Sequence, residues 1–234
     1  MRRLRYLATL VGATAVQGTR VIVAAARGVR QTSGGVYDDA PRRWGRELLD
    51  ALGIVPEVEG LDRLPPGQPC VYVSNHVSYA DVWVLLAVVP GSVRFVAKKE
   101  LLRIPLFAQA LRQGGQIVID RRHLKSAFGA YDAAAAAIRA GMSAIVFVEG
   151  TRSSDGALLP FKKGPFVLAI AAQVPVVPVY VEGTREVLPR GRLVARQHPV
   201  RVRFGAPIPT AGLGYEDRDA LSARAREAML ALRR

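Results

Sequence analysis

The sequence predicts a single α/β domain built on a mixed, largely parallel sheet that is flanked by helices. Short apolar runs that suit buried strands recur along the chain, for example at residues 71–74 and 144–148. Stretches with helical periodicity or apolar composition separate these runs, as helices separate the strands of a parallel sheet. The length of 234 residues suits one domain rather than two.

In the first half of the chain we expect a helix that has Pro41 in its first turn and ends at Gly53, because proline suits a helix start and glycine a helix end. Residues 65–67 form a loop. Residues 71–74 then form a buried strand, and residues 81–89 a buried helix. The expected elements that follow are a strand at 94–97, a short helix at 104–111 and a strand at 116–119.

In the second half, an amphipathic helix is indicated by apolar residues at spacings of four, three, four and three, namely Leu124, Phe128, Tyr131, Ala135 and Ile138. Gly141 ends this helix. We expect strands at residues 144–148, 175–181 and 200–204, and a closing helix over residues 215–234.

The N-terminal segment, residues 1–37, contains six arginines and no acidic residue. Gln17 and Arg20 interrupt its apolar stretches, which would otherwise be long enough to span a membrane. The pattern favours a helix that lies in the membrane interface with arginines near lipid phosphates. A secretory signal, a tilted span and an ordinary core helix are the alternatives. We therefore expect a membrane-associating segment at 1–37 and a folded domain at 38–234.

The net charge of +14 points to an anionic partner, which could be a nucleic acid, an acidic membrane surface or a phosphorylated substrate. Aromatic residues make up only 7% of the chain and no nucleic-acid-binding signature is present, so we expect no nucleic acid. The single cysteine, Cys70, excludes an intrachain disulfide and suits a buried core residue. The motifs of serine hydrolases, dinucleotide and P-loop enzymes, and zinc proteases are missing.

His76 is the histidine best placed for chemistry, because it follows the apolar strand at 71–74 and strand ends are where α/β folds build their sites. Asp81 lies five positions later, where the next helix begins. Its carboxylate could hold one ring nitrogen of His76 while the other accepts a proton from a substrate hydroxyl. The alternative is that Asp81 only favours the helix terminus and His76 is an ordinary loop residue.

Two further predicted strands also end in charged residues, one in Asp120-Arg121 and the other in Glu149-Gly150-Thr151-Arg152. Because parallel strands end at one edge of a sheet, we expect these residues to share that edge with His76. Arg121 and Arg152 carry planar, permanently charged groups that suit a phosphate.

These residues resemble, in order, the four sequence blocks of the glycerolipid acyltransferases, the family of lysophosphatidate and glycerol-3-phosphate acyltransferases. The first block is Asn75-His76 with Asp81. The second is the strand from Gly115 to Arg121, the third is residues 147–152 and the fourth is the two-proline strand at 174–179. Val148 stands where the family usually has proline, which alters the turn that presents Glu149 and Arg152.

The resemblance implies that His76 is a general base, that Asp81 orients it, and that a hydroxyl attacks a thioester without an acyl-enzyme. Lys98, or backbone N–H groups near residues 75–78, would stabilise the oxyanion, although Lys98 could instead belong to a solvated basic face. The implied acceptor site contains Asn75, Asp120, Arg121, Glu149, Gly150, Thr151 and Arg152.

The implied activity is transfer of a fatty acyl group from acyl-CoA or acyl carrier protein to 1-acyl-glycerol-3-phosphate, with no metal or cofactor. The expected partners are the thioester, the lysophospholipid and an anionic membrane surface, and the expected location is the cytoplasmic face of a membrane. The alternatives are another acceptor, such as glycerol 3-phosphate or an amino-acid-containing lysolipid, and a catalytically silent lipid-binding protein.

Overall fold

The computed structural model describes residues 2–31, 33–98, 102, 105–119 and 124–233, and within these ranges seven strands form one sheet. The strands are β1 (Glu57–Glu59), β2 (Val71–Ser74), β3 (Val93–Lys98), β4 (Ile117–Ile119), β5 (Ser143–Phe147), β6 (Val176–Glu182) and β7 (Arg201–Phe204). Their order is β1-β7-β6-β2-β5-β3-β4. Five strands, from β6 to β4, run parallel, while β7 pairs antiparallel with β6 and parallel with β1. The prediction of a mixed, largely parallel sheet is confirmed.

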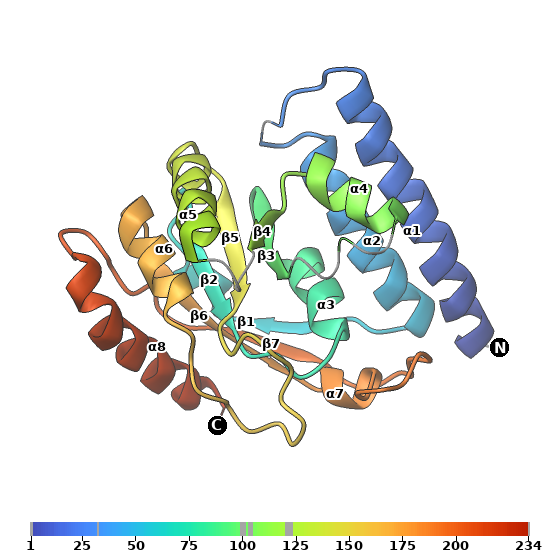
Figure 1. Ribbon diagram of the computed structural model, residues 1–234. Coiled ribbons are helices and arrows are strands. Elements are labelled where there is room, and N and C mark those ends of the chain that lie inside the picture. The colour runs from blue at the N-terminus through green and yellow to red at the C-terminus, as the bar shows by residue number, and fades with distance from the viewer. Residues whose placement is uncertain (1, 32, 99–101, 103–104, 120–123, 234) are drawn as a thin grey trace.

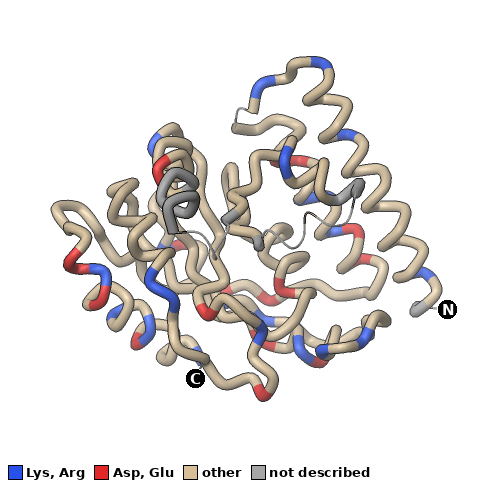
Figure 2. Tube along the Cα trace, in the orientation of Figure 1, with Lys and Arg blue, Asp and Glu red and all other residues tan. Residues whose placement is uncertain are grey.

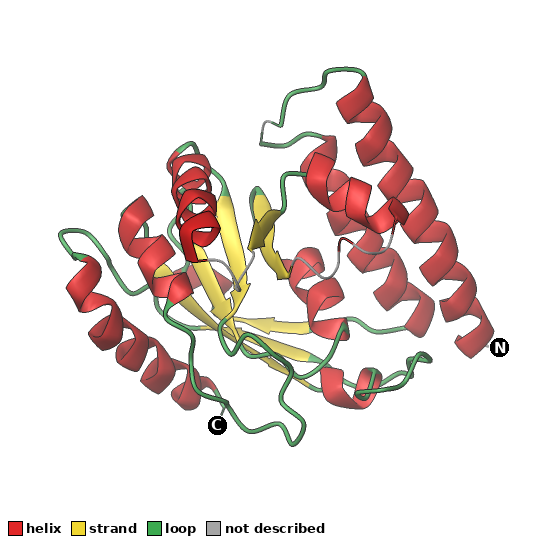
Figure 3. Cartoon of the chain, in the orientation of Figure 1, coloured by secondary structure: helices red, strands yellow, loops and turns green. Residues whose placement is uncertain are grey.

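Helices cover both faces of the sheet (Figures 1 and 3). They are α1 (Arg2–Ala26), α2 (Val36–Leu52), α3 (Ala80–Val88), α4 (Pro105–Gln113), α5 (Leu124–Arg139), α6 (Gly164–Ala172), α7 (Thr184–Val187) and α8 (Arg218–Leu232), with single 3-10 turns at Leu61–Arg63 and Tyr215–Asp217. Helices α5, α6 and α8 lie on one face. Helices α2 and α3 lie on the other, with α1 and α4 outside them.

Alternation along the central strands divides the core into two clusters, one on each face of the sheet. In β2, Val71 and Val73 belong to the cluster beneath α5, α6 and α8, while Tyr72 belongs to the cluster beneath α2 and α3. Successive side chains of a strand point to opposite faces, so a strand buried on both faces is apolar throughout. This explains why the central strands could be located from short apolar runs.

Helix α1 packs along α2, on the outside of the helical layer. The Tyr6 ring is buried and lies 5.7 Å from the Trp83 ring, measured between centroids. At the start of α1, the Arg5 guanidinium donates to the carbonyl oxygens of Asp50 and Ala51 at the end of α2. These contacts dock the N-terminal helix onto the domain. The expected boundary after residue 37 lies inside α2, because α2 begins at Val36.

The stretch Leu4–Ala26 is long and apolar enough to cross a membrane, by length and composition. The apolar 18-residue window in this stretch has a mean hydropathy of 1.4, and 17% of that window is buried. A signal sequence or a core helix meets the same criteria, although a core helix would be mostly buried. The rest of the protein therefore leaves much of the apolar surface of α1 exposed.

The start of α2 differs from the prediction. The helix begins at Val36, so the expectation of Pro41 in the first turn is wrong, and Pro41 lies inside the helix. Asp38 and Asp39 occupy the first turn, where carboxylates are favoured by the helix dipole. Further elements that were not predicted are strand β1 and helices α6 and α7.

Candidate active site

The candidate site lies at the carboxyl ends of β2 and β5, which are parallel neighbours with Ser74 opposite Phe147. This register brings His76 beside Glu149. The backbone N–H of His76 donates to Glu149 Oε1 at 2.9 Å, and the His76 carbonyl accepts from the Ser153 backbone N–H at 2.8 Å. Two turns that are far apart in sequence are thereby joined at one edge of the sheet.

His76 and Asp81 form a hydrogen-bonded pair. His76 Nδ1 lies 2.7 Å from Asp81 Oδ2, and the His76 side chain is 14% exposed while that of Asp81 is fully buried. A carboxylate accepts only, so Nδ1 carries the proton and donates it to Asp81. Nε2 of a neutral His76 then has its lone pair available, which is the state a general base requires.

The Asp81 carboxylate is held by three further donors. Oδ2 also accepts the backbone N–H groups of Val77 and Ser78 at 2.8 and 2.9 Å, and Oδ1 accepts the hydroxyl of Thr184. Hydrogen bonds to the charged form stabilise a buried carboxylate. The same contacts fix its orientation, so the imidazole of His76 has a rigid partner.

The turn that carries His76 is also tied to the neighbouring strand β6. The Asn75 side chain makes two hydrogen bonds to the backbone of Val181, one as donor at 2.9 Å and one as acceptor at 2.7 Å. Ser78 Oγ donates to the Leu188 carbonyl at 2.8 Å. Asn75 is 2% exposed, and both ends of its amide bond to Val181, so its side chain fastens the turn to β6.

An apolar pocket lies directly beside the histidine. The ring of Phe147 stacks on that of His76, with centroids 3.8 Å apart and planes 9° from parallel. Phe147 also lines a pocket of about 300 Å³ together with Val96, Tyr131, Val146, Lys162 and Pro165. A hydrocarbon chain is the kind of ligand that such a lining accommodates.

Arg152 supplies a positive charge at the same turn. Its guanidinium lies over the ring of Tyr79, 3.9 Å from the centroid, while Tyr79 is half-exposed. Within the described ranges Arg152 has no carboxylate partner, so its charge is available to an anion. Thr151 beside it is exposed, and Gly150 adopts a positive φ of 73° that suits glycine.

Glu149 is 2% exposed, and both of its carboxylate oxygens already accept backbone N–H groups, from His76 and from Leu159. Burial raises the pKa of its carboxyl above the ordinary value, and the two backbone hydrogen bonds oppose that shift. A buried carboxyl group whose two oxygens already accept hydrogen bonds is unsuited to contact a phosphate. The geometry favours a role for Glu149 in joining the two turns over the direct acceptor contact that the sequence had suggested.

The structure describes some of the groups that were expected to donate a hydrogen bond to the oxyanion. Of the backbone N–H groups expected as alternatives near residues 75–78, those of His76, Val77 and Ser78 already donate to carboxylates. Lys98 is the last residue of β3, a parallel strand next to β5, and its side chain lies outside the described part of the structure. Asp120 and Arg121, which follow β4, lie outside the described residues altogether.

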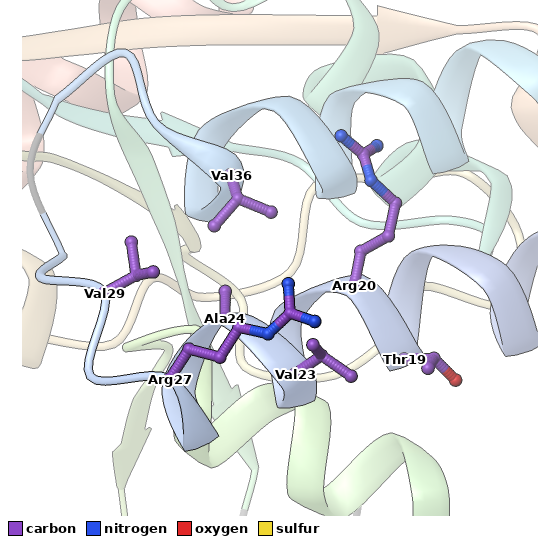
Figure 4. Close-up of a pocket in the computed structure, with 7 residues that line it drawn as sticks. All are labelled: Thr19, Arg20, Val23, Ala24, Arg27, Val29 and Val36. Atoms are coloured by element: carbon purple, nitrogen blue, oxygen red, sulfur yellow. The ribbon is translucent and has the colours of Figure 1, made fainter.

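A second pocket, of about 440 Å³, lies far from His76. It is lined by Thr19, Arg20, Val23, Ala24, Arg27, Val29 and Val36, between the end of α1 and the start of α2 (Figure 4). Asp38, near this start, pairs with Arg94 close to the beginning of β3 at 2.6 Å, so the pocket lies toward the amino ends of the strands. Arg20 already donates to Asp39 and Gln17.

Sequence reasoning missed two contributors to the site, Thr184 and Phe147. Thr184 binds Asp81 from the end of β6, and a signal existed, because it closely follows a predicted strand parallel to β2. Phe147 is the first residue of the third sequence block, and its residue type alone predicts no role at the site. Its stacking on His76 follows from the register between β2 and β5. A local sequence pattern does not reveal this register. Cys70 is buried as expected, and burial raises the pKa of its thiol to about 11, which disfavours a nucleophilic thiolate.

The fold and site define an α/β protein with a His–Asp pair at the carboxyl edge of a largely parallel sheet. A family model described as acyltransferase matches residues 55–182, more than half of the chain. The chain therefore belongs to the acyltransferase family, and the resemblance inferred from its sequence blocks is confirmed.

Two relatives share the name 1-acyl-sn-glycerol-3-phosphate acyltransferase. The chain is 37% identical over 179 residues to human 1-acyl-sn-glycerol-3-phosphate acyltransferase alpha, covering 76% of this chain and 63% of the relative. It is 38% identical over 168 residues to the chloroplastic 1-acyl-sn-glycerol-3-phosphate acyltransferase BAT2 of Brassica napus, covering 69% of this chain and 48% of the relative. The chain thus spans less than two thirds of the length of these curated relatives.

Among solved structures, the chain is similar to the 1-acyl-sn-glycerophosphate (LPA) acyltransferase PlsC from Thermotoga maritima. The TM-score is 0.70 and the sequence identity 26%, with all of this chain and 98% of the other covered. The similarity includes the N-terminal helix, because the whole of this chain is covered.

Proposed function

We propose that the protein transfers a fatty acyl group from a thioester to the free hydroxyl of 1-acyl-glycerol-3-phosphate, which gives phosphatidic acid. The observation that carries the proposal is the pairing of His76 Nδ1 with the buried Asp81, which leaves Nε2 available as a base. Beside it lie an apolar pocket and Arg152, which has no carboxylate partner among the described residues. The names of the relatives and of the solved structure supply the acceptor.

In the proposed reaction, His76 Nε2 removes the proton from the acceptor hydroxyl while the oxygen attacks the thioester carbonyl carbon. Lys98 donates to the oxyanion of the tetrahedral intermediate. The carbon–sulfur bond then breaks, and the imidazolium returns its proton to the leaving thiolate. Asp81 stabilises the imidazolium while it exists, and no bond to the protein forms at any step.

The two ends of the acceptor match two features of the site. The Arg152 guanidinium, with Arg121 and Thr151, binds the phosphate, since planar guanidinium groups suit phosphate oxygens. Asn75, Glu149 and Gly150 hold the two turns in place, and Asp120 is assigned to the acceptor site by the family resemblance alone. An acyl chain occupies the apolar pocket beside Phe147.

We also propose that the protein works on a membrane. The apolar side chains of Leu4, Val11 and Val16 on α1 are more than half exposed, and lipid would cover them. Acyl-CoA and acyl carrier protein are water-soluble donors, which favours the cytoplasmic face of an anionic membrane as the place of reaction. No cofactor enters the scheme.

The direct test is lipid mass spectrometry after incubating the full chain with a donor and a panel of acceptors. The panel contains 1-acyl-glycerol-3-phosphate, glycerol 3-phosphate and an amino-acid-containing lysolipid, each offered with acyl-CoA and with acyl carrier protein. We expect phosphatidic acid from the first acceptor. Product from another acceptor alone would overturn the substrate assignment, and no acyl transfer to any acceptor would leave a lipid-binding protein.

His76→Ala tests the proposed mechanism. General acid–base catalysis contributes about 10²–10⁴-fold, so the turnover number should fall by that factor while circular dichroism shows an intact fold. His198→Ala is the matched variant, because His198 has a partly exposed side chain whose described hydrogen bond is to the neighbouring Pro199 carbonyl. A folded His76→Ala protein with near-normal turnover would contradict the mechanism.

A further inference from the structure

Exposed apolar side chains gather around the end of α2, apart from the catalytic turn. Val55, two residues beyond Gly53, the glycine cap of α2, is 89% exposed. Leu193 and Val194, in the α7–β7 loop (residues 188–200), are 82% and 39% exposed, and Leu4 at the start of α1 is 76% exposed. Large aliphatic side chains that lie so open and so near one another indicate an interaction surface.

Hydrogen bonds bring these three segments together. Arg5, next to Leu4, donates to the Ala51 carbonyl at 2.9 Å, and Gln197 of the α7–β7 loop donates to the Gly53 carbonyl at 2.9 Å. Farther along, the Glu57 backbone N–H donates to the Val200 carbonyl at 2.9 Å. The start of α1 and the loop thus both bind the end of α2, and Figure 1 shows them on the same side of the molecule.

The α7–β7 loop is also basic. Arg190, Arg192 and Arg196 are exposed, and none of them has a carboxylate partner among the residues that the structure describes. Figure 2 shows blue segments along α7 and the chain that follows it. Apolar side chains with exposed arginines around them match the chemistry of an acidic lipid surface, which offers hydrocarbon below a layer of phosphates.

The loop begins at the catalytic turn. The carbonyl of Leu188, its first residue, accepts the Ser78 hydroxyl, and Thr184 just before it donates to Asp81. A membrane contact made by this loop would therefore fix the orientation of the edge that carries His76. It would do so at a point well separated in sequence from α1.

We propose that the α7–β7 loop, together with Val55, is a second membrane-contact surface, which docks on acidic lipid next to Leu4 of α1. Leu193 and Val194 enter the acyl boundary, and Arg190, Arg192 and Arg196 bind lipid phosphates. This rests on the proposed function only in that a membrane acceptor is used; the contact itself is independent of catalysis. A protein partner is less well matched, since the patch has no aromatic anchor of the kind that dominates protein interfaces.

The first experiment places a polarity-sensitive fluorophore on the full chain. In a Cys70→Ala background, Leu193→Cys provides a single labelling position, and Leu230→Cys on α8 is the matched control, since Leu230 is also exposed. With vesicles of phosphatidylglycerol and phosphatidylcholine, the label at 193 should shift to the blue and be quenched by lipid-borne quenchers, while the label at 230 should not. Equal responses at both positions would overturn the proposal. A blue shift that depends on protein concentration without vesicles would indicate a second copy instead.

The second experiment measures vesicle binding by co-sedimentation. Each arginine near an acidic leaflet contributes about fivefold to affinity, equivalent to about 1 kcal/mol, so Arg190→Gln/Arg192→Gln should lower affinity by more than tenfold at low salt and less at high salt. Leu193→Ser/Val194→Ser should lower it at both salt concentrations. Arg224→Gln/Leu230→Ser on α8 is the control.

Activity separates this proposal from the proposed function. On a short-chain soluble acceptor all three double variants should match the unsubstituted protein. Unchanged vesicle affinity in both loop variants would overturn the second surface and leave the acyl transfer untouched. Loss of turnover by the unsubstituted protein on every acceptor would instead refute the proposed function alone.

Discussion

Helices α3 and α1 are both rich in apolar residues and both pack against α2, yet the fold treats them differently. In α3, six of nine residues are buried, including the carboxylate of Asp81. In α1, the buried residues keep to one stripe, formed by Tyr6, Ala13, Gln17, Val21 and Ala24. Leu4, Val11 and Val16 point away from the protein and are more than half exposed.

The difference shows that apolar composition does not by itself say where a helix lies. Burial of apolar surface contributes about 25 cal/mol per Å², whatever the covering material is. In α3 the covering material is protein over most of the helix, which fixes Asp81 rigidly. In α1 the protein covers one stripe, and the uncovered stripe is the part of the helix available to lipid.

The largest effect on turnover is expected from a substitution in α3 that disturbs Asp81. Asp81→Asn replaces one acceptor oxygen with an NH₂ donor, although Asp81 accepts from four groups. We expect turnover to fall by about 10²–10⁴-fold on soluble and membrane acceptors alike, and the free energy of unfolding to fall by about 2 kcal/mol. Thr184→Val, which removes one of the four donors, should show a smaller loss. Equal turnover in Asp81→Asn and the unsubstituted protein would contradict the pairing with His76.

Two glycine substitutions compare the helices through stability. An added Cβ on Gly45 of α2 would lie 2.5 Å from the Trp83 carbonyl oxygen of α3, whereas one on Gly12 of α1 would meet nothing within 4 Å. Gly45→Ala should therefore lower the free energy of unfolding by about 2 kcal/mol. Gly12→Ala should raise it, by up to about 1 kcal/mol, because alanine favours helix. Urea unfolding measures both. The same sign for both would contradict the close packing of α2 on α3.

Arg152→Ala tests how the site holds the acceptor. We expect the KM for a phosphorylated acceptor to rise about tenfold, since a charged hydrogen bond contributes about 1.5–3 kcal/mol, while the KM for the thioester stays the same. Steady-state kinetics with each substrate varied in turn gives both constants. An increase in the thioester KM alone would place Arg152 on the donor instead.

The smallest effect on chemistry is expected from the exposed stripe of α1. Leu4→Ser/Val11→Ser leaves Tyr6 and the packed stripe intact, which deletion of the helix would not. Vesicle affinity should fall several-fold, as expected for the loss of two partly buried aliphatic groups, and activity on a membrane acceptor should fall with it. Activity on a short-chain soluble acceptor should be unchanged. Loss of folding in this variant would show that the stripe belongs to the core.

The central strands could be predicted because they are buried on both faces and therefore apolar throughout. Helix α6 could not, since Gly164–Ala172 is apolar on every side and follows no helical period. Strand β1 has the sequence Glu-Val-Glu and lies at the edge of the sheet, where three residues give no recognisable pattern.

At the site, the spacing of His76 and Asp81 was visible because both lie on one turn. The contacts of Asn75 with Val181 and of Thr184 with Asp81 join residues more than 100 positions apart, and no local pattern contains such pairs. The burial of Glu149 could not be read from a local pattern either, and the sequence therefore suggested that Glu149 contacts the acceptor. What the sequence leaves undetermined is the register between strands.

The long-range contacts of the catalytic turn have a consequence for how the protein is made. During synthesis, residues 75–81 leave the ribosome more than 100 positions before Val181, Thr184 and Leu188, which complete the hydrogen bonds of that turn. Pairing over such separations forms late, because a long loop must first be closed. A nascent chain that has already exposed the apolar stripe of α1 therefore still lacks an oriented histidine. On the proposed function, the chain reaches a membrane before it can carry out chemistry there.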